Sequence, residues 1–348
     1  MLKRFKYFLV TLVVTTSPSL FAQPVPTAST LTLSKGKIEE ALKAAHSSYR
    51  NLSEGKNADY IPALAKVPSD LFAITLITVD GQIYSIGDSD TAFSIQSISK
   101  VFTMAQVFQE MGEKPVYENL GVDATGQAFN SIVAIEQHKG KEQNPLVNPG
   151  AIAATSMIKG KNAKEIWNKI LSIHNSFAGR KLSLNQEVYK SEAATNQRNQ
   201  AIAMLMAAYD RIKSDPAIAT DLYTRACSIN ATTKDLAAMA ATLANGGFNP
   251  LSKAQVIEQK HIKHILAVMA TAGLYDESGK WLFKTGLPAK SGVGGGLIAV
   301  APGQFGIAAF SPRLDGAGNS VRAQRAIEKI VEHLNANPYD VKPMGSGL

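Results

Sequence analysis

The sequence predicts an α+β fold in which one antiparallel sheet is built from both ends of the chain. Strand-like residues with a turn signal occur at 71–86, and a strand-like pattern returns after Lys290, at 297–310. The chain between these two regions is mostly helical in pattern. The simplest arrangement is a sheet flanked by terminal helices, with the central helices forming a second lobe.

The first predicted elements lead to this sheet. Residues 37–52 carry apolar side chains at helical spacing, and residues 57–67 suggest a loop with a short helical turn. Residues 71–79 are rich in β-branched side chains, and Asp80-Gly81 is a hairpin signal before a returning strand at 83–86. A helix is expected from about Ser97 to Gly112.

From there to about Trp281 we expect helices, interrupted by loops at Pro115, 144–150, 179–185 and 246–250. A second hairpin, 297–301 with 305–310, turns at 302–304 and precedes an amphipathic helix at 319–334. The expected organisation is a leader at 1–22, a flexible tether at 23–34, a domain at 35–335 and a loose tail at 336–348. Within the domain, the sheet lobe comprises 35–96 and 285–335, and the helical lobe 97–284.

Length and charge narrow the classes of function. A chain of 348 residues can bury a sizeable core. Its formal charge is +8, of which Lys3, Arg4 and Lys6 supply three, so the remainder beyond residue 22 carries +5. Lys and Arg are not interleaved with aromatic residues in any run, so nucleic-acid binding is not expected.

Residues 1–22 have the layout of a cleavable secretory signal peptide. They combine a basic start, an apolar stretch at 7–14 and a polar segment that ends in Leu-Phe-Ala. The apolar stretch is too short to span a membrane. We therefore expect an exported, periplasmic protein without a stable membrane anchor. The alternative is a cytoplasmic protein with a disordered or weakly anchored N-terminus.

The segment FSIQSISKVF at 93–102 is the predicted active centre. Ser97 and Lys100 stand three residues apart, so on a helix they share one face, as an activated serine nucleophile requires. Ser-x-x-Lys also occurs at Ser34, Ser53 and Ser156. Only Ser97 follows a sheet segment at the start of a helix, where the helix N-terminus favours developing negative charge. The alternative is that Ser97 merely caps the helix.

A second signal is Lys290-Ser291-Gly292. A Lys-Ser/Thr-Gly strand segment is the partner of Ser-x-x-Lys in penicillin-recognising serine enzymes. The similar Lys284-Thr285-Gly286 is followed by Pro288, which interrupts strand pairing, whereas Lys290-Ser291-Gly292 leads into a glycine-rich run and a strand. The alternative for the second signal alone is an ordinary glycine-rich turn.

Other chemistries have weaker support. Among six histidines only His261 and His264 have a spacing typical of metal ligands, and we interpret them as a solvated helix face. The single cysteine, Cys227, excludes an internal disulfide and is interpreted as a buried structural thiol. No phosphate loop or dinucleotide fingerprint is present, and we expect neither a cofactor nor a metal.

Taken together, these segments resemble serine-dependent glutaminases of the bacterial glutaminase A type. The resemblance covers about residues 35–335 in family order. It rests on ADYIP (58–62), IQSISK (95–100), FNS (129–131), NPLVNPGAI (144–152), VYKSE (188–192), Arg198-Asn199, Tyr223, Cys227-Ser228, GLYD (273–276), GLPAKSGVGGG (286–296), Ser311-Pro312 and GNS (318–320). It implies a β-lactamase/DD-peptidase-like fold, a homodimer or homotetramer, and L-glutamine as substrate.

The resemblance also implies catalytic roles. Ser97 is the expected nucleophile that attacks the side-chain amide carbon of glutamine, and Lys100 is the expected proton acceptor. Tyr275 is expected to relay protons, and the backbone N–H groups of Ser97 and Val293 to form the oxyanion hole. A lysine base needs a lowered pKa, from desolvation or from a second cation, for which Lys290 is the candidate.

Further residues match the family's substrate site. Glu192 is expected to meet the α-ammonium of glutamine. Asn148, Asn199 and Tyr223 are expected to hold the α-carboxylate and amino-acid backbone, and Tyr60 to close the pocket. The remaining expected substrate contacts are Ser97, Tyr275 and Val293. The expected supporting residues are Gln96, Lys290, Ser291 and Gly292. The sequence departs from the family's usual residues at Pro149, next to Asn148, and at Ala194, Asn196 and Gln197.

Two other classes of function remain open at this point. An exported β-lactamase or DD-peptidase shares the Ser/Lys pair and Lys290-Ser291-Gly292 but has no use for residues that bind a zwitterion. It would also need a Ser-Asp-Asn element, which does not follow Ser97. A non-catalytic amino-acid-binding protein would keep the pocket but has no use for Ser97, Lys100 and Tyr275.

Overall fold

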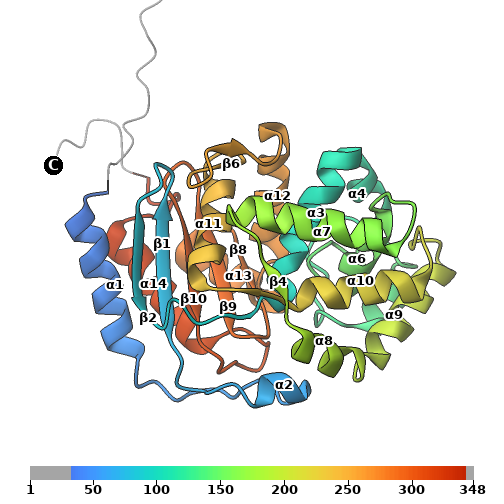
Figure 1. Ribbon diagram of the computed structural model, residues 1–348, viewed down its shortest axis with the longest axis horizontal. Helices are drawn as coiled ribbons and strands as arrows, with labels where there is room; N and C mark the ends of the chain where they lie inside the picture. Colours follow the sequence, from blue (N-terminus) through green and yellow to red (C-terminus); the bar gives the residue numbers. More distant parts are fainter. Residues whose placement is uncertain (1–32, 342–348) are drawn as a thin grey trace, which may run out of the picture. The chain divides into compact units, whose positions relative to one another are not determined.

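The computed structural model describes residues 33–341, so the predicted leader at 1–22 lies outside the described residues, as does nearly all of the tether. Its main sheet has five antiparallel strands in the order β2-β1-β10-β9-β8 (Figure 1). These strands are β1 (Ala73–Thr78), β2 (Ile83–Gly87), β8 (Ala289–Ser291), β9 (Gly296–Ala301) and β10 (Phe305–Phe310). Ala73 pairs with Phe310 and Thr78 with Phe305, so the two ends of the domain meet between β1 and β10. The predicted sheet is confirmed.

Helices cover both faces of this sheet (Figure 1). Helices α1 (Lys35–Tyr49) and α14 (Val321–Leu334) pack against each other and against one face, and α11 (Thr233–Ala244) packs against β1, β9 and β10 on the other. Ser320 caps α14 through its side chain, so this helix begins two residues later than predicted. Ala336, just beyond α14, is buried in the same core.

The other helices connect the sheet strands or lie beside the active centre. They are α2 (Pro62–Ala65), α3 (Ser99–Met111), α4 (Lys114–Asn119), α5 (Ile132–Gln137), α6 (Asn148–Met157), α7 (Ala163–Ala178), α8 (Gln186–Ala193), α9 (Gln197–Ala208), α10 (Pro216–Cys227), α12 (Gln259–Ala272) and α13 (Ser278–Thr285), with 3₁₀ turns η1 (Gln96–Ile98) and η2 (Tyr275–Glu277). Within the described range, none of the helices is long and apolar enough to cross a membrane.

Two predicted loops contain helix starts. Pro115 lies in the first turn of α4, and Pro149 lies in the first turn of α6. The first N–H groups of a helix have no intrahelical partner, so a proline there removes no hydrogen bond. Proline in these two segments therefore marks the beginning of a helix, whereas we predicted loops.

Short strands were missed because two or three residues are too few to show a period. β3 (Phe93–Ser94), β5 (Ile229–Ala231) and β4 (Ser183–Leu184) form a small sheet in the order β3-β5-β4. β6 (Phe248–Asn249) and β7 (Ala254–Gln255) form a hairpin. The first of these sheets matters for function because β3 leads directly into the turn that carries Ser97.

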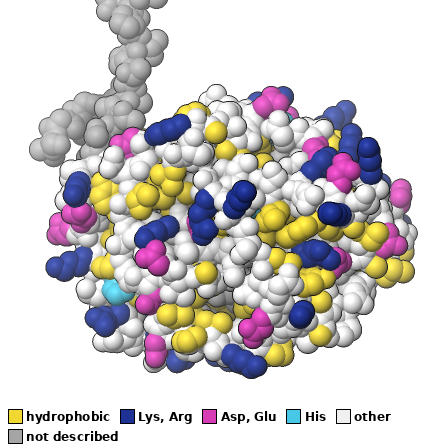
Figure 2. Space-filling model, viewed as in Figure 1, with side chains coloured by type: hydrophobic (Ala, Val, Ile, Leu, Met, Phe, Trp, Pro, Cys, Tyr) yellow, Lys and Arg dark blue, Asp and Glu magenta, His cyan; other side chains and the backbone are white. Residues whose placement is uncertain are grey.

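A continuous core joins the sheet to the central helices. Phe310 and Ile298 of the sheet belong to the same buried cluster as Phe102 of α3 and Met239 of α11. The predicted boundary between a sheet lobe and a helical lobe crosses this cluster and stays a prediction. On the face shown in Figure 2, side chains of both charges are interspersed, and neither sign gathers into one large patch.

The contact between α11 and the sheet depends on Gly306 of β10. A Cβ at this position would lie 2.0 Å from the backbone nitrogen of Ala241. That distance is far inside van der Waals contact, so any side chain here pushes the helix off the sheet.

We expect Gly306→Ala to destabilise the protein by about 3 kcal/mol or more, at the upper end of overpacking effects, because the obstructing atoms belong to a helix backbone. Denaturant unfolding measures this change. Gly316→Ala is the control because no atom lies within 4 Å of its Cβ, and it should stay within about 0.5 kcal/mol of the parent. Equal midpoints for the two variants would contradict this account of the α11 contact.

Candidate active site

Ser97 lies in η1, the tight turn between β3 and α3. Gln96, immediately before it, has a positive φ of 49°, in the left-handed region that non-glycine residues rarely adopt. Such strain costs on the order of 1–3 kcal/mol and persists where surrounding structure holds it in place. The turn carries Ser97 to the wall of a cavity one helical turn ahead of Lys100.

Gly292 holds the end of β8 against this turn. A Cβ at Gly292 would lie 2.5 Å from the carbonyl oxygen of Ile95 and 3.3 Å from the nitrogen of Ser97. Only glycine permits this approach of two backbones. It places Val293 at the same cavity as Ser97, as the predicted oxyanion hole requires.

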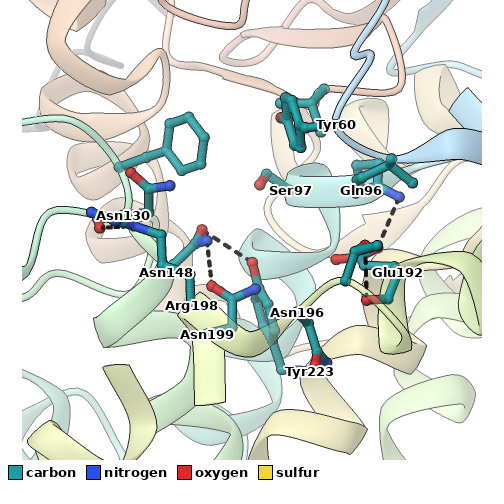
Figure 3. Close-up of a pocket in the computed structure, with 14 residues that line it drawn as sticks. Tyr60, Gln96, Ser97, Asn130, Asn148, Glu192, Asn196, Arg198, Asn199 and Tyr223 are labelled. Atoms are coloured by element: carbon teal, nitrogen blue, oxygen red, sulfur yellow. Dashed lines mark hydrogen bonds between the residues drawn. The ribbon is translucent and has the colours of Figure 1, made fainter. Parts of the chain in front are cut away.

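The cavity has a volume of about 320 Å³ and contains most of the predicted substrate residues (Figure 3). Its predicted lining residues are Tyr60, Gln96, Ser97, Asn148, Glu192, Asn199, Tyr223 and Val293. Tyr60 is exposed, while the other seven are buried or half-buried. Glu192 and Asn148 lie on opposite sides of Ser97 (Figure 3).

Lys100 is buried behind this cavity. Its Nζ donates to the side-chain oxygen of Asn148 at 2.6 Å and to the backbone carbonyl of Leu146 at 3.5 Å. Burial lowers the pKa of Lys100 to about 8, while the nearby Cys227 and Glu192 act in the opposite direction. Of the two predicted causes of a lowered pKa, desolvation is therefore the larger one for Lys100.

Lys290 lies in β8 and is also buried. Its Nζ donates to the carbonyls of Gly273 and Ser291 at 2.9 and 2.7 Å, and it lies 4.2 Å from the centre of the Tyr275 ring. Burial, and then the positive charge of Lys100, hold the pKa of Lys290 well below its usual value. Lys290 therefore packs against the Tyr275 ring and links the end of β8 to Gly273, and the two buried lysines disfavour each other's charged form.

Tyr275 lies in η2 with a positive φ of 59°, so its backbone is strained, as that of Gln96 is. Its hydroxyl is buried without a hydrogen bond of normal geometry, as is that of Ser291. Burial raises the pKa of Tyr275 to about 12, and the neighbouring hydroxyls of Ser97 and Ser291 act against this rise. The phenol is therefore neutral and can donate or accept a proton beside Ser97.

Glu192 provides a negative charge on one side of the cavity. Gln96 Nε2 donates to its carboxylate at 3.2 Å, which orients the group. Burial raises the pKa of Glu192 to about 7, while the bond from Gln96 and the charge of Lys100 lower it. A buried carboxylate of this kind gains most from an ammonium partner.

The opposite side of the cavity is built from amides and a phenol. Asn148 Nδ2 donates to Asn199 Oδ1 at 3.0 Å, and the Tyr223 hydroxyl donates to Asn148 Oδ1 at 3.1 Å (Figure 3). Pro149, in the first turn of α6, leaves these bonds of Asn148 in place. The remaining N–H of Asn148 is suited to an anionic oxygen.

Sequence reasoning gave no role to six further lining residues. They are Ile61, Phe129, Asn130, Thr195, Asn196 and Arg198. Ile61, Phe129, Asn130 and Arg198 fall inside quoted motifs, and Arg198 Nε donates to the Asn130 carbonyl at 3.1 Å. Asn196 was noted only as a departure, and Thr195 carries no signal in a single sequence.

The competing candidates lie elsewhere or form no site. The interpretation of His261 and His264 as a solvated face is wrong for His261, which is buried with Nδ1 3.3 Å from Glu113, because the start of α12 packs on the end of α3.

Cys227 is buried as predicted, beside Lys100, and burial raises its pKa to about 12. Among residues 33–341, no three His, Cys, Asp or Glu side chains are grouped to hold a metal ion. Thr285 is the last residue of α13, so Lys284-Thr285-Gly286 ends a helix.

Comparison with known proteins agrees with this site. The family model described as Glutaminase matches residues 55–339. A glutaminase from Colwellia psychrerythraea is 52% identical over 302 residues, covering 87% of this chain and 97% of that protein. A glutaminase from Mycobacterium ulcerans is 49% identical over 309 residues, covering 89% and 97%.

Solved structures show the same fold. The probable glutaminase ybaS has a TM-score of 0.88 at 46% identity, over 89% of this chain and all of that one. The probable glutaminase of Bacillus subtilis has a TM-score of 0.79 at 28% identity, over 86% and 96%. The predicted β-lactamase-like fold is confirmed, and nothing in these comparisons supports the β-lactam-hydrolase alternative. We conclude that the chain belongs to the glutaminase family.

Proposed function

We propose that the protein hydrolyses L-glutamine to L-glutamate and ammonia through a glutamyl ester on Ser97. The observation that carries this proposal is the placement of a buried carboxylate, Glu192, and a neutral amide group, Asn148, on opposite sides of Ser97. Glutamine is a zwitterion at its α-carbon, and these two groups match its ammonium and carboxylate. The glutaminases at about 50% identity, and a related structure described as Mglu in its glutamate form, support the choice of substrate.

Acylation follows from the groups around Ser97. The Ser97 oxygen forms a bond to the side-chain amide carbon while its proton passes to Lys100, directly or through the Tyr275 hydroxyl. The pKa of about 8 leaves part of Lys100 neutral near pH 7, as a base requires. Collapse of the tetrahedral intermediate breaks the C–N bond, and the nitrogen leaves as ammonia after receiving that proton. Water then attacks the ester carbon while Lys100 takes one of its protons, the ester C–O bond breaks, and that proton passes to the Ser97 oxygen. The carboxylic acid product gives its remaining proton to the released ammonia, which leaves glutamate.

The oxyanion is stabilised by backbone donors. The N–H groups of Ser97 and Val293 belong to the two segments that Gly292 holds together. Loss of one such donor typically lowers kcat by about a hundredfold or more. The oxyanion hole explains why the strained turn η1 and the glycine-rich end of β8 lie against each other.

The nucleophile is tested by ammonia release from glutamine, with asparagine and a chromogenic β-lactam as alternative substrates. The parent protein should release ammonia from glutamine, and Ser97→Ala should lower that rate by at least about a thousandfold because no covalent ester forms. Ser53→Ala, in an exposed Ser-x-x-Lys pair, is the control and should retain full activity. Lactam turnover without glutamine turnover would contradict the proposal.

The ammonium site is tested by Glu192→Gln. Loss of the charge that meets the α-ammonium should raise KM by about tenfold to a thousandfold, in line with removal of a buried charged partner, with a smaller effect on kcat. Glu187→Gln on the exposed face of the same helix is the control and should leave KM unchanged. An unaltered KM in Glu192→Gln would remove this residue from the substrate site.

We also propose that the protein is exported after cleavage within the 1–22 leader, and that it forms a homodimer or homotetramer. The leader pattern supports export, and the family resemblance supports the homo-oligomer. Cell fractionation with sequencing of the mature N-terminus should find the protein in the periplasm beginning near residue 23. Light scattering should give two or four times the chain mass. Cytosolic protein that retains Met1 would contradict export.

A further inference from the structure

We propose that Asn148 is the positioning residue for Lys100, in addition to being a substrate contact. This inference rests on the proposed function, because it assigns the group that orients the base of the reaction. A buried amide carries this inference. The side-chain oxygen of Asn148 accepts a hydrogen bond from Lys100, and its side-chain nitrogen donates one to Asn199, which lines the cavity.

The hydrogen bonds of Lys100 match the two N–H donors of a neutral amine. A neutral amine has two N–H donors and one lone pair. The structure provides two acceptors, Asn148 Oδ1 at 2.6 Å and the Leu146 carbonyl at 3.5 Å. With both N–H groups directed to these oxygens, the lone pair takes the remaining position, which is where the proton of Ser97 has to arrive.

The amide of Asn148 is itself fixed on both sides. The hydroxyl of Tyr223 donates to Oδ1 at 3.1 Å, and Nδ2 donates to Asn199 Oδ1 at 3.0 Å. A rotation that exchanged the oxygen and nitrogen would break these bonds together with the bond to Lys100. Tyr223 and Asn199 line the substrate cavity, so one rigid amide connects substrate recognition to the base.

Other charged or titratable groups also face Lys100. Glu192 of α8 and Cys227 of α10 act on its pKa, and Lys290 of β8 responds to its charge. The Tyr223 ring centre lies 5.6 Å from its Nζ. The Tyr275 hydroxyl lies beside Ser97, and His174 packs against Phe102 of α3. Of these side chains, only Asn148 accepts a hydrogen bond from Lys100 among the described residues.

Two substitutions at Asn148 should move the acid limb of the kcat/KM–pH profile in opposite directions. In the parent this limb reports the protonation of Lys100 and, at lower pH, that of Glu192, whose pKa is raised to about 7. Asn148→Asp places a carboxylate against the lysine and favours its charged form, so the limb should move up by about 1–3 pH units. At pH 7 this is a loss of about tenfold or more in kcat/KM, recovered in part above pH 9. Asn148→Ala removes an acceptor from the charged form, so its limb should move to lower pH while kcat falls.

Asn199→Asp is the matched control. It introduces the same charge on the residue that accepts a hydrogen bond from Asn148. Asn199 has no hydrogen bond to Lys100 among the described residues. It should raise KM, and its limb should move by much less than that of Asn148→Asp. Thermal melting of all variants verifies that each is folded.

The outcomes separate this inference from the proposed function. A higher KM with an unmoved limb in both Asn148 variants would make Asn148 a substrate contact only and would overturn the inference. Equal limb shifts in Asn148→Asp and Asn199→Asp would also overturn it, because charge alone would then explain the effect. A parent enzyme that releases no ammonia from glutamine would refute the proposed function instead.

Discussion

The close approach of Gly292 to the turn that carries Ser97 is the constraint on which the active site depends. A Cβ at Gly292 would lie 2.5 Å from the Ile95 carbonyl, and one at Gly294 would lie 2.5 Å from the Ser94 carbonyl. The glycine-rich strand end therefore lies directly along β3 and η1. This contact brings residues 93–97 together with residues 290–294, which lie nearly two hundred positions away in sequence. The antiparallel sheet makes the contact possible because its strands come from both ends of the domain.

The same constraint explains why so many costly features gather around one serine. Gln96 and Tyr275 have strained backbones, and Lys100, Lys290 and Glu192 are buried ionisable groups. Each would destabilise the fold if it stood alone. The buried cluster that links α3 and α11 to the sheet provides the apolar contacts that offset these costs. Burial in turn brings the pKa of Lys100 to about 8 and that of Glu192 to about 7, so both groups titrate near neutral pH.

The residue pattern predicted the parts of this structure that local sequence determines. The strands of both hairpins and the helices at 35–49 and 321–334 follow from apolar spacing and turn residues. Ser97 was separated from three similar serines by its place after a strand, and the structure puts it at the cavity wall. The helix starts at Pro115 and Pro149 were predicted as loops although proline in a first turn is a local signal. The two-residue strands and the burial of His261 depend on tertiary packing, which no local pattern encodes. The bond between Lys100 and Asn148 spans 48 positions, so a single sequence contains no signal for it.

Pro149 shows how a departure from the family pattern can be compatible with this site. It lies in the first turn of α6, where the backbone N–H has no helical partner, so the proline ring removes no hydrogen bond. Its fixed φ reduces the conformational freedom of the unfolded chain next to Asn148. Asn148 keeps its bonds to Lys100, Tyr223 and Asn199. The proline at this position is therefore compatible with the hydrogen bonds through which Asn148 connects Lys100 to the residues of the substrate cavity.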